Sequence, residues 1–145
     1  MKISGSYTLP LPRERAYEIM QDPEILARAI PGCESLEKIG PDEYSMKMKM
    51  ALASLSGAFE GKVRITEQTP PESFRLVVEG SGRVGFVKGD GLLKLSAVEA
   101  GTAVAYEGDA QVGGTIASVG QRLIDGTAKM MIKKFFDKLG AEAAS

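Results

Sequence analysis

Short runs of alternating apolar and polar residues dominate the middle of the chain. About six such runs follow one another between Ser35 and Val112, without an intervening helical pattern. The clearest run carries its apolar residues on one face: Tyr44, Met46, Met48 and Met50. Alternation with a period of two residues is typical of a strand that buries one face. The pattern therefore predicts a meandering antiparallel sheet.

Other patterns precede and follow these strands. Lys2 to Thr8 alternates modestly and predicts a first strand. Residues 13–21 form a short amphipathic pattern, and Asp22-Pro23-Glu24 opens a second one with an N-cap, a proline at the first helical position and an acid in the first turn. This second helix is expected to stop at Pro31-Gly32. Gly114 to Leu139 has a long helical pattern and is expected to form one helix.

The predicted terminal helix is apolar over a broad arc. Its apolar positions, with those that widen the arc, are Ile116, Val119, Leu123, Met130, Met131, Ile124, Ala128, Phe135 and Leu139. Such breadth requires a curved partner surface. The chain has 17 glycines, many on inward strand positions, which lets a sheet bend strongly. We therefore predict a single α+β domain over residues 1–145, with a curved antiparallel sheet of about seven strands wrapped around a C-terminal helix, and two short helices after the first strand.

Small inward residues on both sides of this interface predict an internal apolar cavity. The residues expected to line it are Met46, Met48, Met50, Phe59, Val63, Phe86, Leu93, Tyr106, Ile116, Gly120, Leu123 and Met131. Ordinary core packing would account for the same residues. Three methionines on one strand favour a ligand, because flexible thioethers adapt to varied apolar shapes. Tyr106 is expected to offer its hydroxyl to a ligand carbonyl.

Composition and charge exclude several classes of function. The net charge is −1 with acids and bases interspersed, so the electrostatic attraction that drives nucleic-acid binding is lacking. The chain has no histidine, which excludes Ser-His-Asp and Cys-His catalysis and imidazole metal sites, and we predict no catalytic or metal-binding residue. A lone cysteine, with neither a signal peptide nor a membrane-spanning run, predicts a cytoplasmic protein.

Two surface features remain as candidate sites. Pro31, Gly32 and Cys33 form a turn that we expect to flank the cavity mouth, with Cys33 in a structural or gating role. Lys133, Lys134 and Lys138, with Phe136 predicted to be exposed beside them, are expected to form a surface for anionic lipid or an acidic partner. The favourable interaction of cations with a helix C-terminus is the competing explanation for these lysines.

The order of elements resembles the START-like (SRPBCC, helix-grip) superfamily. Within it, four parts of the chain resemble the G-subunit family of carbon monoxide dehydrogenase: Ile30 to Leu36 (IPGCESL), Gly5-Ser6-Tyr7, Asp22-Pro23 and the glycine-rich region from Gly80 to Gly91. The similarity covers essentially the whole chain. The Pro-Gly-Cys run is its more specific part, because the strand pattern alone fits many START-like proteins.

This resemblance implies a non-catalytic accessory protein that works with the subunits of a molybdenum hydroxylase. It also implies a hydrophobic small molecule as ligand, quinone-like or lipid-like, with menaquinone or ubiquinone as a carried rather than covalently bound group. Such a protein would aid electron coupling between the enzyme and the membrane, or recruitment of the enzyme. The expected location is then the cytoplasm, with transient peripheral contact at the inner face of the cytoplasmic membrane.

Two alternatives stay open. One is a START-like enzyme, such as a cyclase or hydrolase, that acts on a polyketide-like substrate through Tyr44, Tyr106 or a buried carboxylate. An inward Asp or Glu would favour it, whereas the alternation places the nearest candidates outward: Glu60, Glu79, Glu107 and Asp109. The other is a maturation chaperone that binds no ligand, which predicts a filled core.

Overall fold

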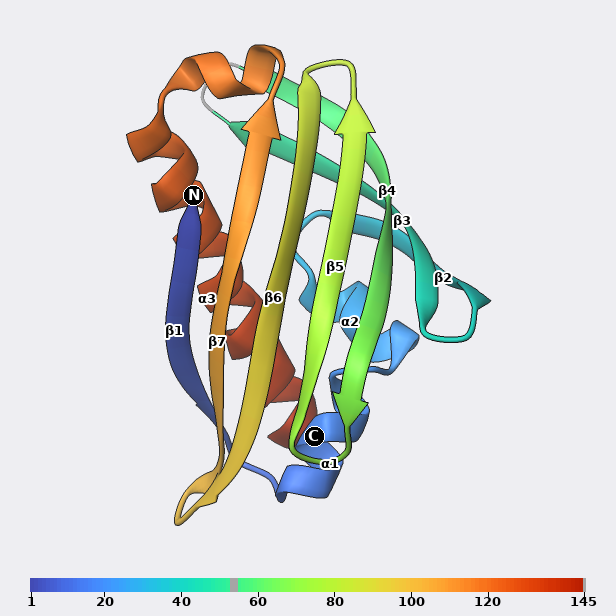
Figure 1. The fold of residues 1–145 in the computed structure, drawn as a ribbon, viewed down its shortest axis with the longest axis vertical. Helices are drawn as coiled ribbons and strands as arrows, with labels where there is room; N and C mark the ends of the chain where they lie inside the picture. Colours follow the sequence, from blue (N-terminus) through green and yellow to red (C-terminus); the bar gives the residue numbers. More distant parts are fainter. Residues whose placement is uncertain (53–54, 145) are drawn as a thin grey trace.

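Seven antiparallel strands form one curved sheet in the computed structural model, which describes residues 1–52 and 55–144 (Figure 1). The strand order is β1-β7-β6-β5-β4-β3-β2, so only β1 is displaced from its sequence neighbour. The strands are β1 (Lys2–Leu9), β2 (Cys33–Gly40), β3 (Glu43–Leu52), β4 (Leu55–Thr69), β5 (Ser73–Gly82), β6 (Gly85–Val98) and β7 (Gly101–Gly113). The predicted meander is confirmed.

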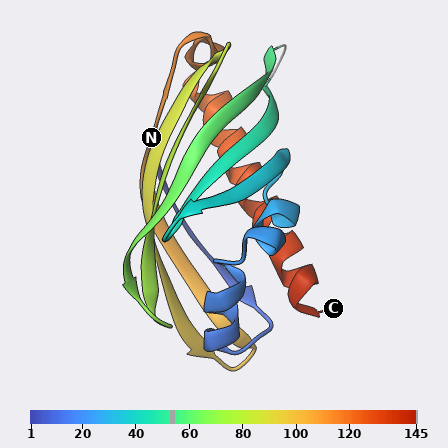
Figure 2. The same cartoon turned by 90° about the vertical axis from the view of Figure 1, so that its right-hand side faces the viewer.

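Helices cover the concave face of this sheet. They are α1 (Arg13–Ile19), α2 (Pro23–Ala29), the 3₁₀ segment η1 (Thr115–Val119) and α3 (Gln121–Ala144). Figure 2 shows α3 crossing the open side of the sheet, with α1 near one end and α2 between α1 and β2. The α2 helix begins as its sequence predicts, because the side chain of Asp22 accepts a hydrogen bond from the backbone N–H of Glu24 at 3.0 Å. The helix-grip architecture is thereby confirmed.

The terminal helix begins later than predicted. A single helix from Gly114 to Leu139 is wrong, because η1 and α3 are separated by Gly120, whose φ is +99°. Glycine adopts such a φ far more readily than other residues do, so this residue ends one segment and redirects the chain into the next. The second segment then continues to Ala144.

The C-terminal half of α3 is fixed to the rest of the protein. Phe136 is only 5% exposed and stacks on Tyr7 of β1 with ring centroids 4.6 Å apart. The prediction that Phe136 is exposed is therefore wrong. Nearer the end of the helix, the Arg28 guanidinium of α2 donates two hydrogen bonds to the Glu142 carboxylate, at 2.9 and 3.0 Å. These contacts hold the C-terminal half of α3 against β1 and α2.

Candidate functional site

A cavity of about 420 Å³ lies between the sheet and α3. This volume is within the range of ligand pockets in proteins. The residues around it are Met1, Ile3, Met20, Leu26, Ile30, Leu36, Tyr44, Met46, Met48, Met50, Phe59, Glu60, Gly61, Val63, Ile65, Phe74, Leu76, Val78, Glu79, Gly80, Val87, Leu93, Ala110, Val112, Ile116, Ile124, Thr127, Ala128, Met131, Ile132 and Phe135. Almost all of them are apolar.

The cavity touches both hydrophobic clusters of the core, and its two ends differ in character. The tyrosine end belongs to the cluster beneath α1 and has mostly compact side chains: Met20, Tyr44, Ile65, Phe74 and Leu93. The methionine end belongs to the cluster beside η1 and has flexible ones: Met1, Met46, Met48, Met50 and Met131. Every methionine of the chain except Met130 lines the cavity. Five of the six methionines in the wall thus lie at one end, beside Phe59 and Ile116, so this end adapts more readily than the other.

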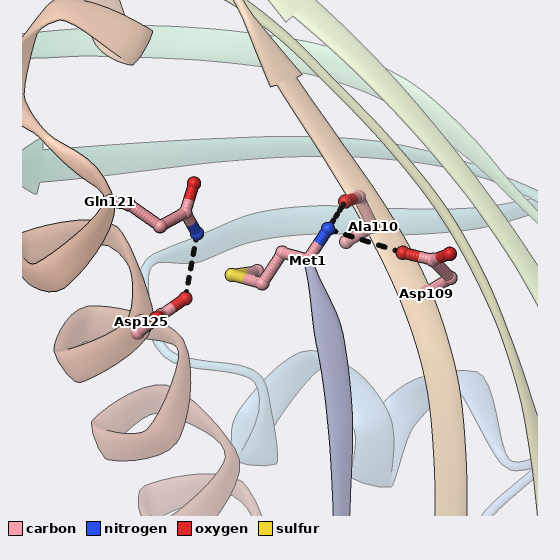
Figure 3. A network of polar contacts seen from close by, with 5 residues as sticks. All are labelled: Met1, Asp109, Ala110, Gln121 and Asp125. Carbon is pink, nitrogen blue, oxygen red and sulfur yellow. Dashed lines mark hydrogen bonds and ion pairs between the residues drawn. The ribbon is translucent and has the colours of Figure 1, made fainter.

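Met1 contributes to the methionine end from an anchored position (Figure 3). Its amino group donates to Asp109 Oδ1 at 3.2 Å and to the carbonyl oxygen of Ala110 at 2.9 Å. The side chain points toward α3, where Gln121 Nε2 donates to Asp125 Oδ1 at 2.8 Å. Sequence reasoning missed Met1 because it precedes the first strand, where no periodic pattern exists.

The structure brings most of the predicted cavity residues together. Those that line the cavity are Met46, Met48, Met50, Phe59, Val63, Leu93, Ile116 and Met131. Four predicted residues do not: Phe86, Tyr106, Gly120 and Leu123. Each of the four is kept out of the cavity wall for a physical reason.

Phe86 and Leu123 each lie one residue away from a residue that lines the cavity. Phe86 is 41% exposed on the outer sheet face, and Val87 points inward in its place. The alternation already grouped position 87 with Leu93, so strict use of the period would have found it. Leu123 is 40% exposed, and the buried Ile124 takes the inward position on α3.

Gly120 and Tyr106 are displaced from the cavity in different ways. Gly120 is an exposed linker between η1 and α3, not a residue inside a helix. Tyr106 does face the core, but its ring lies over Gly5 and stacks with Phe136, with centroids 6.0 Å apart. Burial raises the pKa of Tyr106 above its ordinary value, and the charge of Tyr7 adds to this. Its expected role as the ligand's hydroxyl partner is not supported by this placement.

The Pro31-Gly32-Cys33 turn lies just outside the cavity wall, beside Ile30, which lines the cavity. Gly32 has a φ of +77° and lies so close to the carbonyl of Lys49 that a Cβ would collide with it. Cys33 is half-buried against the methionine end, and its Sγ donates to the carbonyl of Ser35 at 3.5 Å. Burial raises the pKa of the Cys33 thiol, and the charge of Glu34 adds to this. A thiol in this state is a poor nucleophile.

Among the described residues, the acidic ones that border the cavity are exposed to solvent. Glu60 and Glu79 border it, but both residues are exposed, as are Glu107 and Asp109. Thr102 is the only fully buried polar residue in the described part of the chain, and its hydroxyl donates to the carbonyl of Leu11 at 2.7 Å. Residues 1–52 and 55–144 also hold no group of three His, Cys, Asp or Glu side chains placed to bind a metal ion.

The outer face of α3 carries cations beside apolar side chains. Lys133, Lys134 and Lys138 are exposed, and Lys133 donates to Asp137 at 2.7 Å. In place of the buried Phe136, two other apolar residues are exposed on this helix: Leu123 at 40% and Met130 at 48%. No helix among the described residues is long and apolar enough to cross a bilayer.

Comparisons with known proteins agree with the resemblance found in the sequence. The sequence model of the family described as the G subunit of carbon monoxide dehydrogenase (CoxG) matches residues 5–144. A conserved protein from Geobacillus kaustophilus is 35% identical and superposes with a TM-score of 0.94, over 99% of this chain and 95% of that one. No curated protein matches this chain significantly.

More distant structures share the fold alone. A protein from Thermus thermophilus is 16% identical, with a TM-score of 0.73 over 100% of this chain and 99% of that one. The ZhuI aromatase/cyclase from Streptomyces sp. R1128 is 10% identical, with a TM-score of 0.68 over 99% and 93%. The likeness to these two structures shows a shared fold and carries no function over to this chain.

Proposed function

The chain belongs to the G-subunit family of carbon monoxide dehydrogenase, and on this premise we propose that it is a non-catalytic accessory protein of a molybdenum hydroxylase. In this proposal it holds a quinone-like or lipid-like molecule, such as menaquinone or ubiquinone, between the sheet and α3. The enzyme partner follows from the family alone. The ligand is supported by the cavity itself.

The single observation that carries the proposal is an apolar cavity of about 420 Å³ in a small protein. Interiors normally pack densely, so a space of this size lined by apolar groups forfeits contacts that a bound molecule would restore. A maturation chaperone without a ligand gives no reason for such a space. A START-like enzyme would need an acid or base inside it, and the bordering carboxylates, Glu60 and Glu79, belong to exposed residues. Tyr44 does line the cavity, but burial raises its pKa, which makes its hydroxyl a weaker acid and leaves it protonated at neutral pH.

Native mass spectrometry of freshly purified protein, followed by organic extraction, tests this function. We expect a bound quinone or lipid, and uptake of added menaquinone by the emptied protein. Ala128→Phe should block uptake, because residue 128 faces the cavity from α3. Ala141→Phe is the matched control, since Ala141 is exposed on the same helix. An empty protein that takes up neither menaquinone nor ubiquinone would contradict the carrier function and favour protein docking.

The outer face of α3 supports the second half of the proposal, contact with an anionic membrane surface. Its exposed cations are Arg122, Lys129, Lys133, Lys134 and Lys138, and the exposed Leu123 and Met130 lie among them. Basic residues near an anionic bilayer contribute about 1 kcal/mol each, and apolar side chains insert at the headgroup boundary. The same helix lines the cavity with its opposite face, so a docked protein would hold its ligand one helix away from the lipid.

Sedimentation with phosphatidylglycerol vesicles measures this contact. Replacing Lys129 and Lys134 together by Gln should weaken binding by about 2 kcal/mol, roughly 30-fold. The matched control replaces Lys62 and Lys88, exposed on the outer sheet face and each opposite Glu79 in the strand register. Equal losses in the two double variants would mean that binding depends on overall charge rather than on α3.

A further inference from the structure

Tyr44 is the most buried hydrogen-bonding side chain in the wall of the cavity. The residue is 4% exposed and lies at the tyrosine end. Thr127 on α3 is half-buried, and the two bordering glutamates are exposed. A molecule that fills the cavity therefore meets one deeply buried polar group, placed among rings and branched chains.

The Tyr44 hydroxyl is only weakly engaged within the protein. It donates to the backbone carbonyl of Gln21 at 3.3 Å, which is long for an O–H···O hydrogen bond. A phenolic hydroxyl can donate one hydrogen bond and accept others, so capacity remains for a second partner. Burial raises the pKa of Tyr44, and the charges of Asp42 and Asp22 add to this, so the group stays a neutral hydroxyl at neutral pH.

The Gln21 side chain behind Tyr44 is incompletely hydrogen-bonded. Nε2 of Gln21 is buried and makes no hydrogen bond of good geometry among the described residues, although it approaches the Tyr17 hydroxyl. The Gln21 amide lies near Tyr17: burial raises the pKa of Tyr17, and this amide partly offsets the rise. The Tyr17 hydroxyl itself donates to Gln68 Oε1 at 2.8 Å. Gln21 does not line the cavity, so within this region a ligand oxygen would gain its hydrogen bond from Tyr44.

We propose that Tyr44 anchors an oxygen-bearing head group, carbonyl or hydroxyl, of an otherwise apolar ligand, and that the ligand's flexible chain lies at the methionine end. The proposal rests on the function proposed above and adds the ligand's chemistry and direction. Phe74 and Leu93 suit a compact head group beside Tyr44, whereas Met48, Met50 and their neighbours adapt to a chain that takes many shapes.

The substitution Tyr44→Phe tests this, because it removes one oxygen and keeps the ring. Binding is measured by displacement of N-phenyl-1-naphthylamine, a fluorescent apolar probe without oxygen. The competitors are decylubiquinone, 4-decylphenol and decylbenzene, of which the last lacks any oxygen. We expect Tyr44→Phe to weaken the two oxygen-bearing competitors roughly 5- to 150-fold, the range for an unpaired buried polar group. Decylbenzene should change less than about twofold, since it makes no hydrogen bond. The probe carries an N–H donor, so its affinity for each variant is measured directly and used to convert displacement into competitor affinity.

Two variants serve as controls for the loss of a hydroxyl. Tyr17→Phe removes a tyrosine oxygen from the same region but outside the cavity wall, and Thr127→Val removes the other hydroxyl in the wall. Neither should discriminate between 4-decylphenol and decylbenzene. The two oxygen-bearing competitors are then compared in Tyr44→Phe. A larger loss of affinity for decylubiquinone indicates a carbonyl head group, and a larger loss for 4-decylphenol indicates a hydroxyl.

The outcomes separate this proposal from the function on which it rests. If Tyr44→Phe affects all competitors equally, or none, the anchor is refuted while the carrier function stands. If Thr127→Val shows the oxygen-selective loss instead, the head group lies against α3 and the proposed direction is wrong. If wild-type protein binds neither the fluorescent probe nor any competitor, the carrier function fails, and the anchor fails with it.

Discussion

Phe136 either packs in the core and stabilises the fold, or lies on the surface of α3 where a partner could contact it. Its exposure distinguishes these two possibilities. The ring is 5% exposed, stacks on Tyr7 at 4.6 Å and packs edge-on against Phe135 at 5.1 Å. Phe→Ala at a core site costs 3–5 kcal/mol, of which transfer out of water is one part and the cavity left behind the other. Aromatic neighbours add to the loss, so about 4 kcal/mol is expected for Phe136→Ala.

Phe86 provides the matched control for this prediction. It is also a phenylalanine, but it is 41% exposed on the outer sheet face. Full burial of such a side chain contributes about 1.5–3 kcal/mol, so roughly half of that, about 1 kcal/mol, is at stake in Phe86→Ala. Because the site is open to solvent, removal of the ring leaves no enclosed cavity.

Urea unfolding followed by circular dichroism measures both variants. Domains of this size have unfolding free energies of about 5–15 kcal/mol, so Phe136→Ala approaches the limit of folding. Phe136→Leu keeps most of the volume and should cost about 1–1.5 kcal/mol, which keeps the test informative if the alanine variant does not fold. Equal costs for Phe136→Ala and Phe86→Ala, both below about 1.5 kcal/mol, would refute the buried stack and restore Phe136 to the surface.

Three further predictions follow from other parts of the structure. Gly126→Ala should raise the melting temperature by roughly 2–4 °C, because Gly126 lies inside α3 with nothing within 4 Å of an added Cβ; an unchanged or lower value would contradict this. The hydrogen bond from Arg28 lowers the pKa of Glu142, so their contribution to stability is present above the ordinary carboxyl pKa and is lost as pH falls through the lowered one. In Glu142→Gln the unfolding free energy should fall less steeply with decreasing pH across that range than in the wild type. An unchanged slope would argue against a stabilising Arg28–Glu142 pair. Cys33 should react with iodoacetamide at pH 7.5 more slowly in the folded protein than in urea, since burial raises the pKa of its thiol, and equal rates would refute this.

The sheet could be predicted from the sequence because the alternation within each strand shows which of its side chains face the core. Met46 and Met48 alternate with lysines, and a period of two assigns each residue to a face without knowledge of the partner strand. The tyrosine end could not be predicted in the same way. Phe74 and Tyr44 lie on strands that are not neighbours, and Met20 is the C-cap of α1, so they meet through the curvature of the sheet and the packing of α1 against it. The chemistry of one cavity end thus depends on tertiary packing, for which local periodicity has no signal.

The two errors on the terminal helix share one physical cause, which is the break at Gly120. Counting 100° per residue from Ile116 places Leu123 inward and Phe136 outward. That count assumes one continuous helix, whereas the chain passes through η1 and then through a residue at φ +99° before α3 begins. The inward face of α3 is consequently shifted toward one edge of the expected arc, the edge that holds Ile124, Ala128 and Phe135. Ile124 therefore replaces Leu123 at the cavity, Phe136 enters the core, and Leu123 and Met130 become available to the lysine-bearing face.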